Sequence, residues 1–312
     1  MIKKKYLNYI DKLNLPRNKT TLITGGNSGI GFEVAKYCCY LGHKIILGVR
    51  NLERSENAKK ELLNLYPNSD VKLMYIDYSK RETIIAFADQ LKREKIDVDF
   101  FYSNAGVYRL PLTLNDDGSE MTISTNYLGN FLLFFAILNY FKGLKHDVKY
   151  IIVSSIAGRL GNIKYDDFFM LKKYNKVLAY NNSKQCINHL YIYIQKICEN
   201  TNIIPLLVHP GIVYTPLFGK AYKNKVMLGA AKAFMKTFCN PLGKAALSYI
   251  YLIQDKIKEP TFVGPRGLFH VAGYPKVTKL KGRNKNYMKT INFAFDWLKL
   301  TESSCMEEGI LK

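Results

Sequence analysis

The chain has 312 residues, 48% of them hydrophobic, and a formal net charge of +21. This length is within reach of one large α/β domain that buries an ordinary core. The six cysteines show neither C-x-x-C spacing nor a paired pattern, so we expect no metal site, no disulfide framework and a reducing compartment. The positive charge favours an anionic partner, although lysine-rich solvated faces explain it as well.

Short β-rich runs alternate with longer amphipathic runs, which is typical of a parallel sheet covered by helices. We expect strands at 20–24, 44–49, 71–77, 98–103, 149–154 and 203–208. We expect helices at 29–41, 53–66, 80–94, 120–141 and 177–200. The predicted fold class is therefore α/β, with a single doubly wound (Rossmann-type) parallel sheet and helices on both faces.

A glycine-rich segment joins the first strand to the first helix. Glycine permits positive φ and lets the backbone approach a pyrophosphate, whose charge is met by amide N–H groups at the helix N-terminus. A glycine cluster alone is most often a turn, but its place in a βαβ unit favours dinucleotide binding. The candidate contacts in this segment are Gly25, Asn27, Ser28, Gly29, Ile30 and Gly31.

The ends of the next strands carry further candidates. Arg50 ends the second strand, where an acidic residue would bind the ribose diol of NAD and an arginine suits the 2′-phosphate of NADP. Asp77 ends the third strand, and Asn104-Ala105-Gly106 follows the fourth. The carboxyl ends of parallel strands line the ligand crevice of a doubly wound fold, although Asp77 could simply cap the next helix.

Tyr180 and Lys184 are four residues apart and would share one face of a helix. The ammonium would stabilise the phenolate and lower the pKa of the tyrosine from about 10 toward working pH. Such a tyrosine is a general acid or base. The alternative is a half-buried aromatic ring beside a solvated lysine.

Together these motifs resemble the short-chain dehydrogenase/reductase family. The resemblance covers residues 19–264 and rests on the glycine-rich turn, Asn104-Ala105-Gly106, Asn126, Ser154-Ser155, Tyr180-x-x-x-Lys184 and Pro210-Gly211. The runs 126–133, 153–158 and 209–215 are similar to the retinol-dehydrogenase and WW-domain-oxidoreductase-like branch. That branch implies NADP-dependent interconversion of a carbonyl and an alcohol on an apolar substrate, with NAD the less expected cofactor.

The resemblance also implies roles for single residues. Tyr180 would transfer the proton, and Lys184 would lower its pKa and bind the nicotinamide ribose. Ser155 would polarise the substrate oxygen, and Asn126 would hold a water in a relay with Lys184. The implied cofactor contacts beyond the glycine-rich turn are Arg50, Asn51, Asp77, Tyr78, Asn104, Ala105, Gly106, Tyr180, Lys184, Pro210, Gly211, Val213 and Thr215.

We divide the chain into a basic N-terminal extension (1–18), an NADP-binding catalytic domain (19–275) and a basic C-terminal extension (276–312). The apolar segments 156–179 and 215–242 are expected either to form a substrate pocket or to be plain packing. No stretch reaches the roughly 18 consecutive apolar residues of a membrane span, and the N-terminus is too polar for a signal peptide.

The expected location is therefore cytoplasmic, and peripheral association with an anionic membrane surface is a hypothesis that the basic ends suggest. A homo-oligomer is left open. No nucleic acid is expected, because neither a helix-turn-helix nor an aromatic-interleaved RNA motif occurs. Two other functions stay open: an NADP-binding sensor or scaffold with little turnover, and a basic membrane-surface module.

Overall fold

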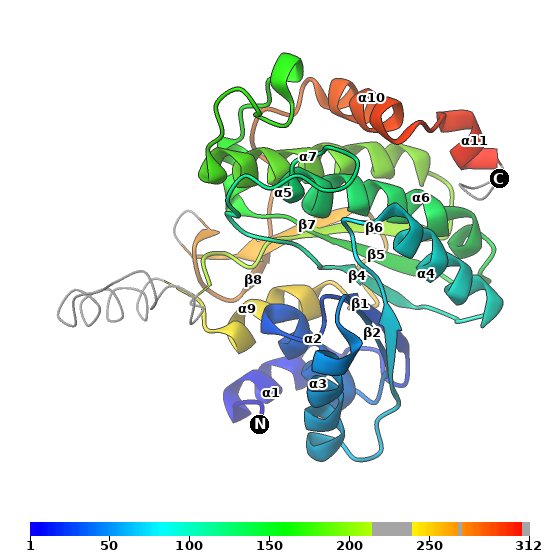
Figure 1. The fold of residues 1–312 in the computed structure, drawn as a ribbon. Helices are drawn as coiled ribbons and strands as arrows, with labels where there is room; N and C mark the ends of the chain where they lie inside the picture. Colours follow the sequence, from blue (N-terminus) through cyan, green and yellow to red (C-terminus); the bar gives the residue numbers. More distant parts are fainter. Residues whose placement is uncertain (214–238, 268–269, 308–312) are drawn as a thin grey trace.

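The computed structural model describes residues 1–213, 239–267 and 270–307. They form an eight-stranded sheet in the order β3-β2-β1-β4-β5-β6-β7-β8 (Figure 1). Neighbouring strands are parallel except β7 and β8, which are antiparallel. The strands are β1 (Thr20–Thr24), β2 (Lys44–Val49), β3 (Val71–Tyr75), β4 (Phe100–Ser103), β5 (Val148–Val153), β6 (Ile203–Val208), β7 (Thr261–Pro265) and β8 (Pro275–Val277).

All six expected strands are present, and β7 and β8 extend the sheet beyond them. The predicted fold class is confirmed. The strand order reverses between β1 and β4, because the chain crosses over from β3 to the other side of β1. In an open parallel sheet this is where a crevice forms at the carboxyl ends of the strands.

Helices cover both faces of the sheet (Figure 1). One core lies under α1 (Lys4–Asp11), α2 (Gly29–Tyr40), α3 (Leu52–Leu65) and α9 (Leu242–Tyr251). The other lies under α4 (Arg81–Arg93), α6 (Gly129–Lys142), α7 (Lys176–Ile197) and α10 (Tyr287–Leu298). The central strands β4, β5 and β6 are buried on both faces, which explains their nearly continuous apolar sequences.

The helix expected over 120–141 is interrupted. It consists of α5 (Met121–Ile123), a π-helical turn η1 (Ser124–Leu128) and α6. Met121–Lys142 is the stretch of the described chain that is long and apolar enough to cross a membrane, but 94% of its most apolar window is buried inside the protein. The aromatic side chains of α6 therefore belong to the core.

Both terminal segments expected as extensions pack onto the sheet domain. Tyr6 and Ile10 of α1 are buried in the core below α9. In the C-terminal part, Ile291 of α10 is fully buried and α10 packs on α7. A last helix, α11 (Glu302–Glu307), contacts α6. The boundaries at 18 and 275 stay a prediction.

Candidate active site

The helix α7 brings Tyr180 and Lys184 to the carboxyl end of β5. Asn175 caps this helix by accepting hydrogen bonds from the amides of Val177 and Leu178. The Nζ of Lys184 lies 6.0 Å from the centre of the Tyr180 ring and donates a 3.0 Å hydrogen bond to the carbonyl oxygen of Val153. Burial lowers the pKa of Lys184 to about 8, because a charged ammonium loses its hydration there.

The pKa of Tyr180 is raised, which is opposite to the expected direction. Burial of the phenol is the largest cause, and a hydrogen bond with Ser155 acts against it by lowering the pKa. Tyr108 raises the pKa further and Arg109 lowers it. The expectation failed because helix spacing says nothing about burial, and because the ammonium of Lys184 is directed at Val153.

Two serines follow β5, and their environments differ. Ser154 is buried, and its Oγ donates a 2.6 Å hydrogen bond to Oδ1 of Asn188. The Ser155 side chain is partly exposed and hydrogen-bonds with Tyr180. Its Oγ also accepts from the amide of Ala157 at 3.2 Å, which starts the 3₁₀ helix η2 (Ile156–Leu160). Ser155 is therefore the serine that lies beside the phenol.

Asn126 lies in the π-helical turn and is fully buried. Its Oδ1 accepts from the amide of Val107 at 2.7 Å, and its Nδ2 donates to the carbonyl of Val107 at 3.0 Å and to Oγ of Ser183 at 2.9 Å. A Cβ added to Gly106 would lie 2.9 Å from Oδ1 of Asn126 and 3.8 Å from Nζ of Lys184. Asn126 thus anchors the segment after β4 next to Lys184, and the water relay stays a prediction.

The glycine-rich turn lies at the carboxyl end of β1 and has the shape that a pyrophosphate needs. Gly25 and Gly29 have φ of +65° and +58°, and a side chain at Gly29 would point into open space. A Cβ on Gly31 would lie 2.6 Å from Nδ2 of Asn104 and 2.7 Å from the carbonyl oxygen of Gly25. Ser28 precedes α2 without a side-chain cap, and Ile30 lies in its first turn. The turn and helix N-terminus therefore fit a dinucleotide phosphate.

The segment after β4 holds this turn in place. Asn104 donates from Nδ2 to the carbonyl oxygen of Thr24 at 2.9 Å. The Oγ1 of Thr24 accepts from the amides of Asn104 and Ala105 at 3.0 and 3.1 Å. Asn104 and Ala105 thus lie next to the glycine-rich turn, and the cofactor contacts expected of Asn104, Ala105 and Gly106 stay a prediction.

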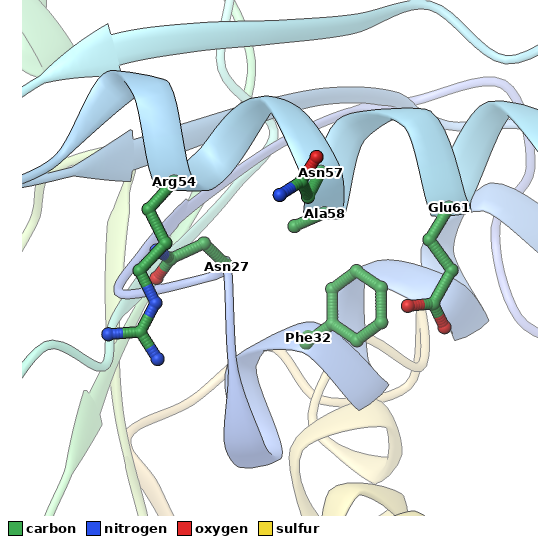
Figure 2. A pocket seen from close by; sticks show the side chains of 6 residues that line it. All are labelled: Asn27, Phe32, Arg54, Asn57, Ala58 and Glu61. Carbon is green, nitrogen blue, oxygen red and sulfur yellow. The ribbon is translucent and has the colours of Figure 1, made fainter.

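A pocket lies beside the turn, between α2 and α3 (Figure 2). Asn27 reaches across to α3 and donates to Oγ of Ser55 at 2.8 Å. Arg50 is exposed at the end of β2, and Asn51 caps α3 by accepting from the amide of Arg54 at 2.7 Å. Arg54 lines the pocket with Asn27, a role the sequence reasoning missed. Its spacing, one helical turn after Arg50, is the signal that could have found it.

Asp77 and Tyr78 have local and buried partners. The Asp77 carboxylate accepts from the amide and the hydroxyl of Ser79 at 2.9 and 2.7 Å, which forms a turn before α4. The Tyr78 hydroxyl is buried between Oγ1 of Thr24 and Oγ of Ser103, at 2.9 and 3.0 Å. The Tyr78 phenol thus braces β1 against β4 from inside the core.

The segment after β6 is held at the same edge of the sheet. Pro210 follows the buried His209, and the Gly211 amide donates to Nδ1 of His209 at 3.2 Å. Gly211 has φ of +77°, and a Cβ there would lie 2.2 Å from the carbonyl oxygen of Val271. Val213 bridges to Asn240. Thr215 and most of the apolar segment 215–242 lie outside the described residues.

The apolar segment 156–179 is largely packing. Phe168, Phe169 and Met170 are buried. Phe168 stacks on Phe293 of α10 with 3.7 Å between ring centres, and Phe169 contacts Trp297 at 4.6 Å. Across the described ranges, no group of three or more His, Cys, Asp or Glu side chains could hold a metal ion.

Most of the chain is similar to known short-chain dehydrogenases. The profile of the short chain dehydrogenase family matches residues 19–226. Retinol dehydrogenase 14 of Mus musculus is 32% identical over 256 residues, covering 76% of this chain and 74% of that protein. The chloroplastic short-chain dehydrogenase TIC 32 B of Brassica napus is 29% identical over 254 residues, covering 77% of each.

Solved structures with the same fold include a putative uncharacterized protein from Mycobacterium Paratuberculosis, with a TM-score of 0.71, 25% identity, and 92% of this chain and 96% of that chain covered. L-sorbose reductase from Gluconobacter frateurii, complexed with NADPH and L-sorbose, superposes with a TM-score of 0.65 at 17% identity, covering 80% and 95%. At that identity the second likeness concerns the fold alone.

Proposed function

Since the chain belongs to the short-chain dehydrogenase/reductase family, in its retinol-dehydrogenase-like branch, we propose that it interconverts a carbonyl and an alcohol with NADP as hydride carrier. The observation that carries the proposal is the closeness of Ser155 to the partly buried Tyr180, since hydrogen bonding to this serine lowers the pKa of the phenol. The phenol lies on the same helix as Lys184, whose ammonium lies near Asn126 and the glycine-rich crevice.

The side chains have complementary roles in this reaction. When bound, the nicotinamide would supply or accept the hydride at the reacting carbon. Tyr180 gives its proton to the carbonyl oxygen in reduction and takes one from the alcohol in oxidation. Ser155 hydrogen-bonds the same oxygen, and Lys184 binds the nicotinamide ribose. The substrate oxygen therefore gains or loses its proton through the phenol of Tyr180.

The raised pKa of Tyr180 keeps the phenol in its protonated form at neutral pH. A phenol whose pKa lies above its ordinary value is protonated at pH 7. The protonated phenol is the form that donates to a carbonyl oxygen. Oxidation needs the phenolate, so we expect it to become faster as the pH rises.

The preference for NADP is supported by two arginines at the edge of the glycine-rich turn. Arg50 is exposed at the end of β2. Arg54 lies on the first turn of α3 and lines the pocket beside the glycine-rich turn (Figure 2). A guanidinium offers the paired donors that a phosphate accepts. Isothermal titration with NADPH and NADH tests this proposal, and a tighter complex with NADH would contradict it.

The proposed substrate is apolar. Three neighbouring strands, β4, β5 and β6, are followed by loops with large exposed apolar side chains, namely Tyr108, Leu160 and Ile212. Because these loops start at the carboxyl edge of the sheet, they border the crevice. Exposed apolar side chains at such a rim suit a substrate with a hydrocarbon part.

The proposed activity is tested with NADPH and a series of aldehydes and ketones of increasing alkyl length. We expect turnover that rises with chain length in the wild type. A Tyr180→Phe variant that binds NADPH equally well should show almost none. If the wild type binds NADPH and reduces nothing, the sensor or scaffold function replaces the proposed one.

We further propose a cytoplasmic protein that associates weakly with anionic membranes; a homo-oligomer stays open. The support is the net charge of +21, together with exposed apolar side chains such as Leu160 and Leu171. Sedimentation with phosphatidylserine vesicles at low salt should carry the protein into the pellet, and phosphatidylcholine vesicles are the control. Equal recovery with both lipids would contradict the membrane proposal.

A further inference from the structure

Residues 279–290, which we call the C-terminal strap, cross the loop that follows Ser155. A Cβ added to Gly282 of the strap would lie 3.3 Å from Cα of Arg159 and 3.7 Å from the carbonyl oxygen of Gly158. Nη1 of Arg283 donates a 2.5 Å hydrogen bond to Oδ1 of Asn162. The strap backbone therefore lies directly on η2 and its C-terminal end.

The other side of this loop rests on α7. A Cβ added to Gly158 would lie 2.8 Å from Nδ2 of Asn188 and 2.8 Å from the carbonyl oxygen of Lys184. The amide of Asn162 donates to Oδ1 of Asn182 at 2.7 Å. The loop that begins at Ser155 is thus enclosed between α7, which carries Tyr180 and Lys184, and the strap.

Two buried side chains of α7 hold the strap. The carbonyl oxygen of Arg283 accepts hydrogen bonds of 2.9 Å from Nε2 of Gln185 and 2.9 Å from Nε2 of His189. A carbonyl only accepts, so Nε2 of His189 carries the proton, and Nδ1 accepts from the hydroxyl of Thr290 at 2.8 Å. The contact in which Nδ1 accepts needs neutral His189, and burial favours this form by lowering the pKa of the imidazole.

Thr290 connects the strap to the segment between Ser155 and Tyr180. The hydroxyl of Tyr165, in that segment, lies 3.0 Å from Oγ1 of Thr290. The Tyr127 hydroxyl donates to the carbonyl oxygen of Thr290 at 2.8 Å. Tyr127 belongs to the same π-helical turn as Asn126. The strap is therefore bonded to α7 and to the π-helical turn, which carry proposed catalytic side chains, and to the segment that joins Ser155 to Tyr180.

We propose that Gln185 and His189 are positioning residues that hold the C-terminal strap against α7 and thereby keep Ser155 beside Tyr180. The inference rests on the proposed function, in which Ser155 and Tyr180 bind one substrate oxygen. Without the strap, the loop would lose its contacts with Gly282 and Arg283. A loop displaced by about 1 Å would cost a large part of the rate, because proton transfer needs hydrogen-bond distance.

The decisive variants change the strap contact in different ways. His189→Leu removes both hydrogen bonds, whereas His189→Gln keeps a donor near the position of Nε2. Gly282→Ala changes the strap itself. The φ of Gly282 is +126°, which strains an alanine, and the added Cβ would crowd the backbone of Arg159. Gly118→Ala is the matched control, because φ is +81° and no atom lies within 4 Å of the added Cβ.

We expect His189→Leu and Gly282→Ala to lower kcat by about tenfold or more while the KM for NADPH stays within about twofold. His189→Gln should recover most of kcat, and Gly118→Ala should retain the wild-type value. Unchanged kcat in His189→Leu and Gly282→Ala, or an equal loss in Gly118→Ala, would overturn the proposal.

The pH profile supplies a readout that a general loss of stability would not move. Tyr180 faces Ser155, Lys184 on α7, Tyr108 and Arg109 after β4, and Tyr249 on α9. Among these, Ser155 is the group that the strap holds. Loss of its hydrogen bond raises the pKa of Tyr180, so the alkaline rise of alcohol oxidation should move to higher pH in His189→Leu. An unshifted profile would count against the proposal.

Hydrogen–deuterium exchange separates this inference from the proposed function. Peptides covering residues 155–162 should exchange faster in His189→Leu and Gly282→Ala than in the wild type and Gly118→Ala. This comparison needs no turnover. If the wild type reduces no substrate, the proposed function fails, but the exchange data still test whether the strap holds the loop after Ser155. Equal exchange rates in all four proteins would refute that role of the strap.

Discussion

The ammonium of Lys184 donates a 3.0 Å hydrogen bond to the carbonyl oxygen of Val153, the last residue of β5. This contact joins α7 to the strand that leads into Ser155. The same helix thus carries the proton-transferring phenol and a side chain that fixes the end of the strand beside it. Because the ammonium is buried, its pKa falls to about 8.

Replacing Tyr180 by phenylalanine should remove the proton donor and leave the cofactor site intact. We expect carbonyl reduction with NADPH to fall by about 10²–10⁴-fold, the usual contribution of a general acid. Fluorescence titration should give an unchanged Kd for NADPH. Tyr191→Phe is the control, because Tyr191 lies on α7 about 16 Å further along the helix. A similar loss in both variants would contradict the assigned role.

Arg50 and Arg54 should determine the choice between NADP and NAD. We expect Arg50→Ala and Arg54→Ala each to weaken NADPH binding by about 1.5–3 kcal/mol, the range of hydrogen bonds to charged groups. NADH binding should change little, because NADH lacks the 2′-phosphate. Lys60→Ala, an exposed cation on α3, is the control for general charge. Equal weakening for NADPH and NADH would assign the arginines to another part of the cofactor or to the fold.

Gly31→Ala should damage the glycine-rich turn. The new Cβ would lie within 2.7 Å of both Asn104 and Gly25, so one of these contacts must give way. We expect loss of measurable NADPH binding and a destabilisation of about 1–3 kcal/mol in urea unfolding. Gly143→Ala, with its nearest neighbour at 3.4 Å, is the control and should bind NADPH normally. Normal binding by Gly31→Ala would show that this turn does not hold the cofactor.

The buried Lys184 should make folding stability depend on pH. Its pKa is about 8 in the folded protein and near 10.5 when exposed, so the unfolded chain binds more protons between these values. Stability therefore rises with pH across this window. From pH 7.5 to 9.5 we expect the wild type to gain about 2 kcal/mol relative to Lys184→Met in urea unfolding. Lys149 has a similarly lowered pKa but is present in both proteins, so its effect cancels. Parallel stability curves would mean that Lys184 is more hydrated than its burial indicates.

The alternation of apolar runs was sufficient to predict the six central strands and the doubly wound sheet. Strands buried on both faces need continuous apolar residues, and a glycine-rich turn between a strand and a helix is typical of a dinucleotide-binding βαβ unit. The π-helical turn around Asn126 was not predictable in this way. The side chains in and next to this turn form hydrogen bonds with residues distant in sequence: Asn126 with Val107 and Asn130 with Ser103.

The C-terminal segment shows that a charge pattern can hide the residues that pack against the core. Its lysines led us to expect a basic extension, but those lysines lie mainly on the solvent side. The smaller set of inward residues decides the packing: Ile291 and Ala294 are buried against the core and Thr290 binds His189. The lysine content of a segment indicates which side chains face water. The few residues that contact a distant helix produce no periodic pattern in the local sequence.

By itself, the sequence determined the fold class, the location of the glycine-rich turn and the pairing of Tyr180 with Lys184 on one helix. These are local properties of backbone and helix geometry. Only the tertiary structure decided the sign of the Tyr180 pKa shift, the burial of Ser154 against Asn188 and the place of the C-terminal strap. Each of these depends on burial and on contacts between segments far apart in the chain, which spacing along the sequence does not encode.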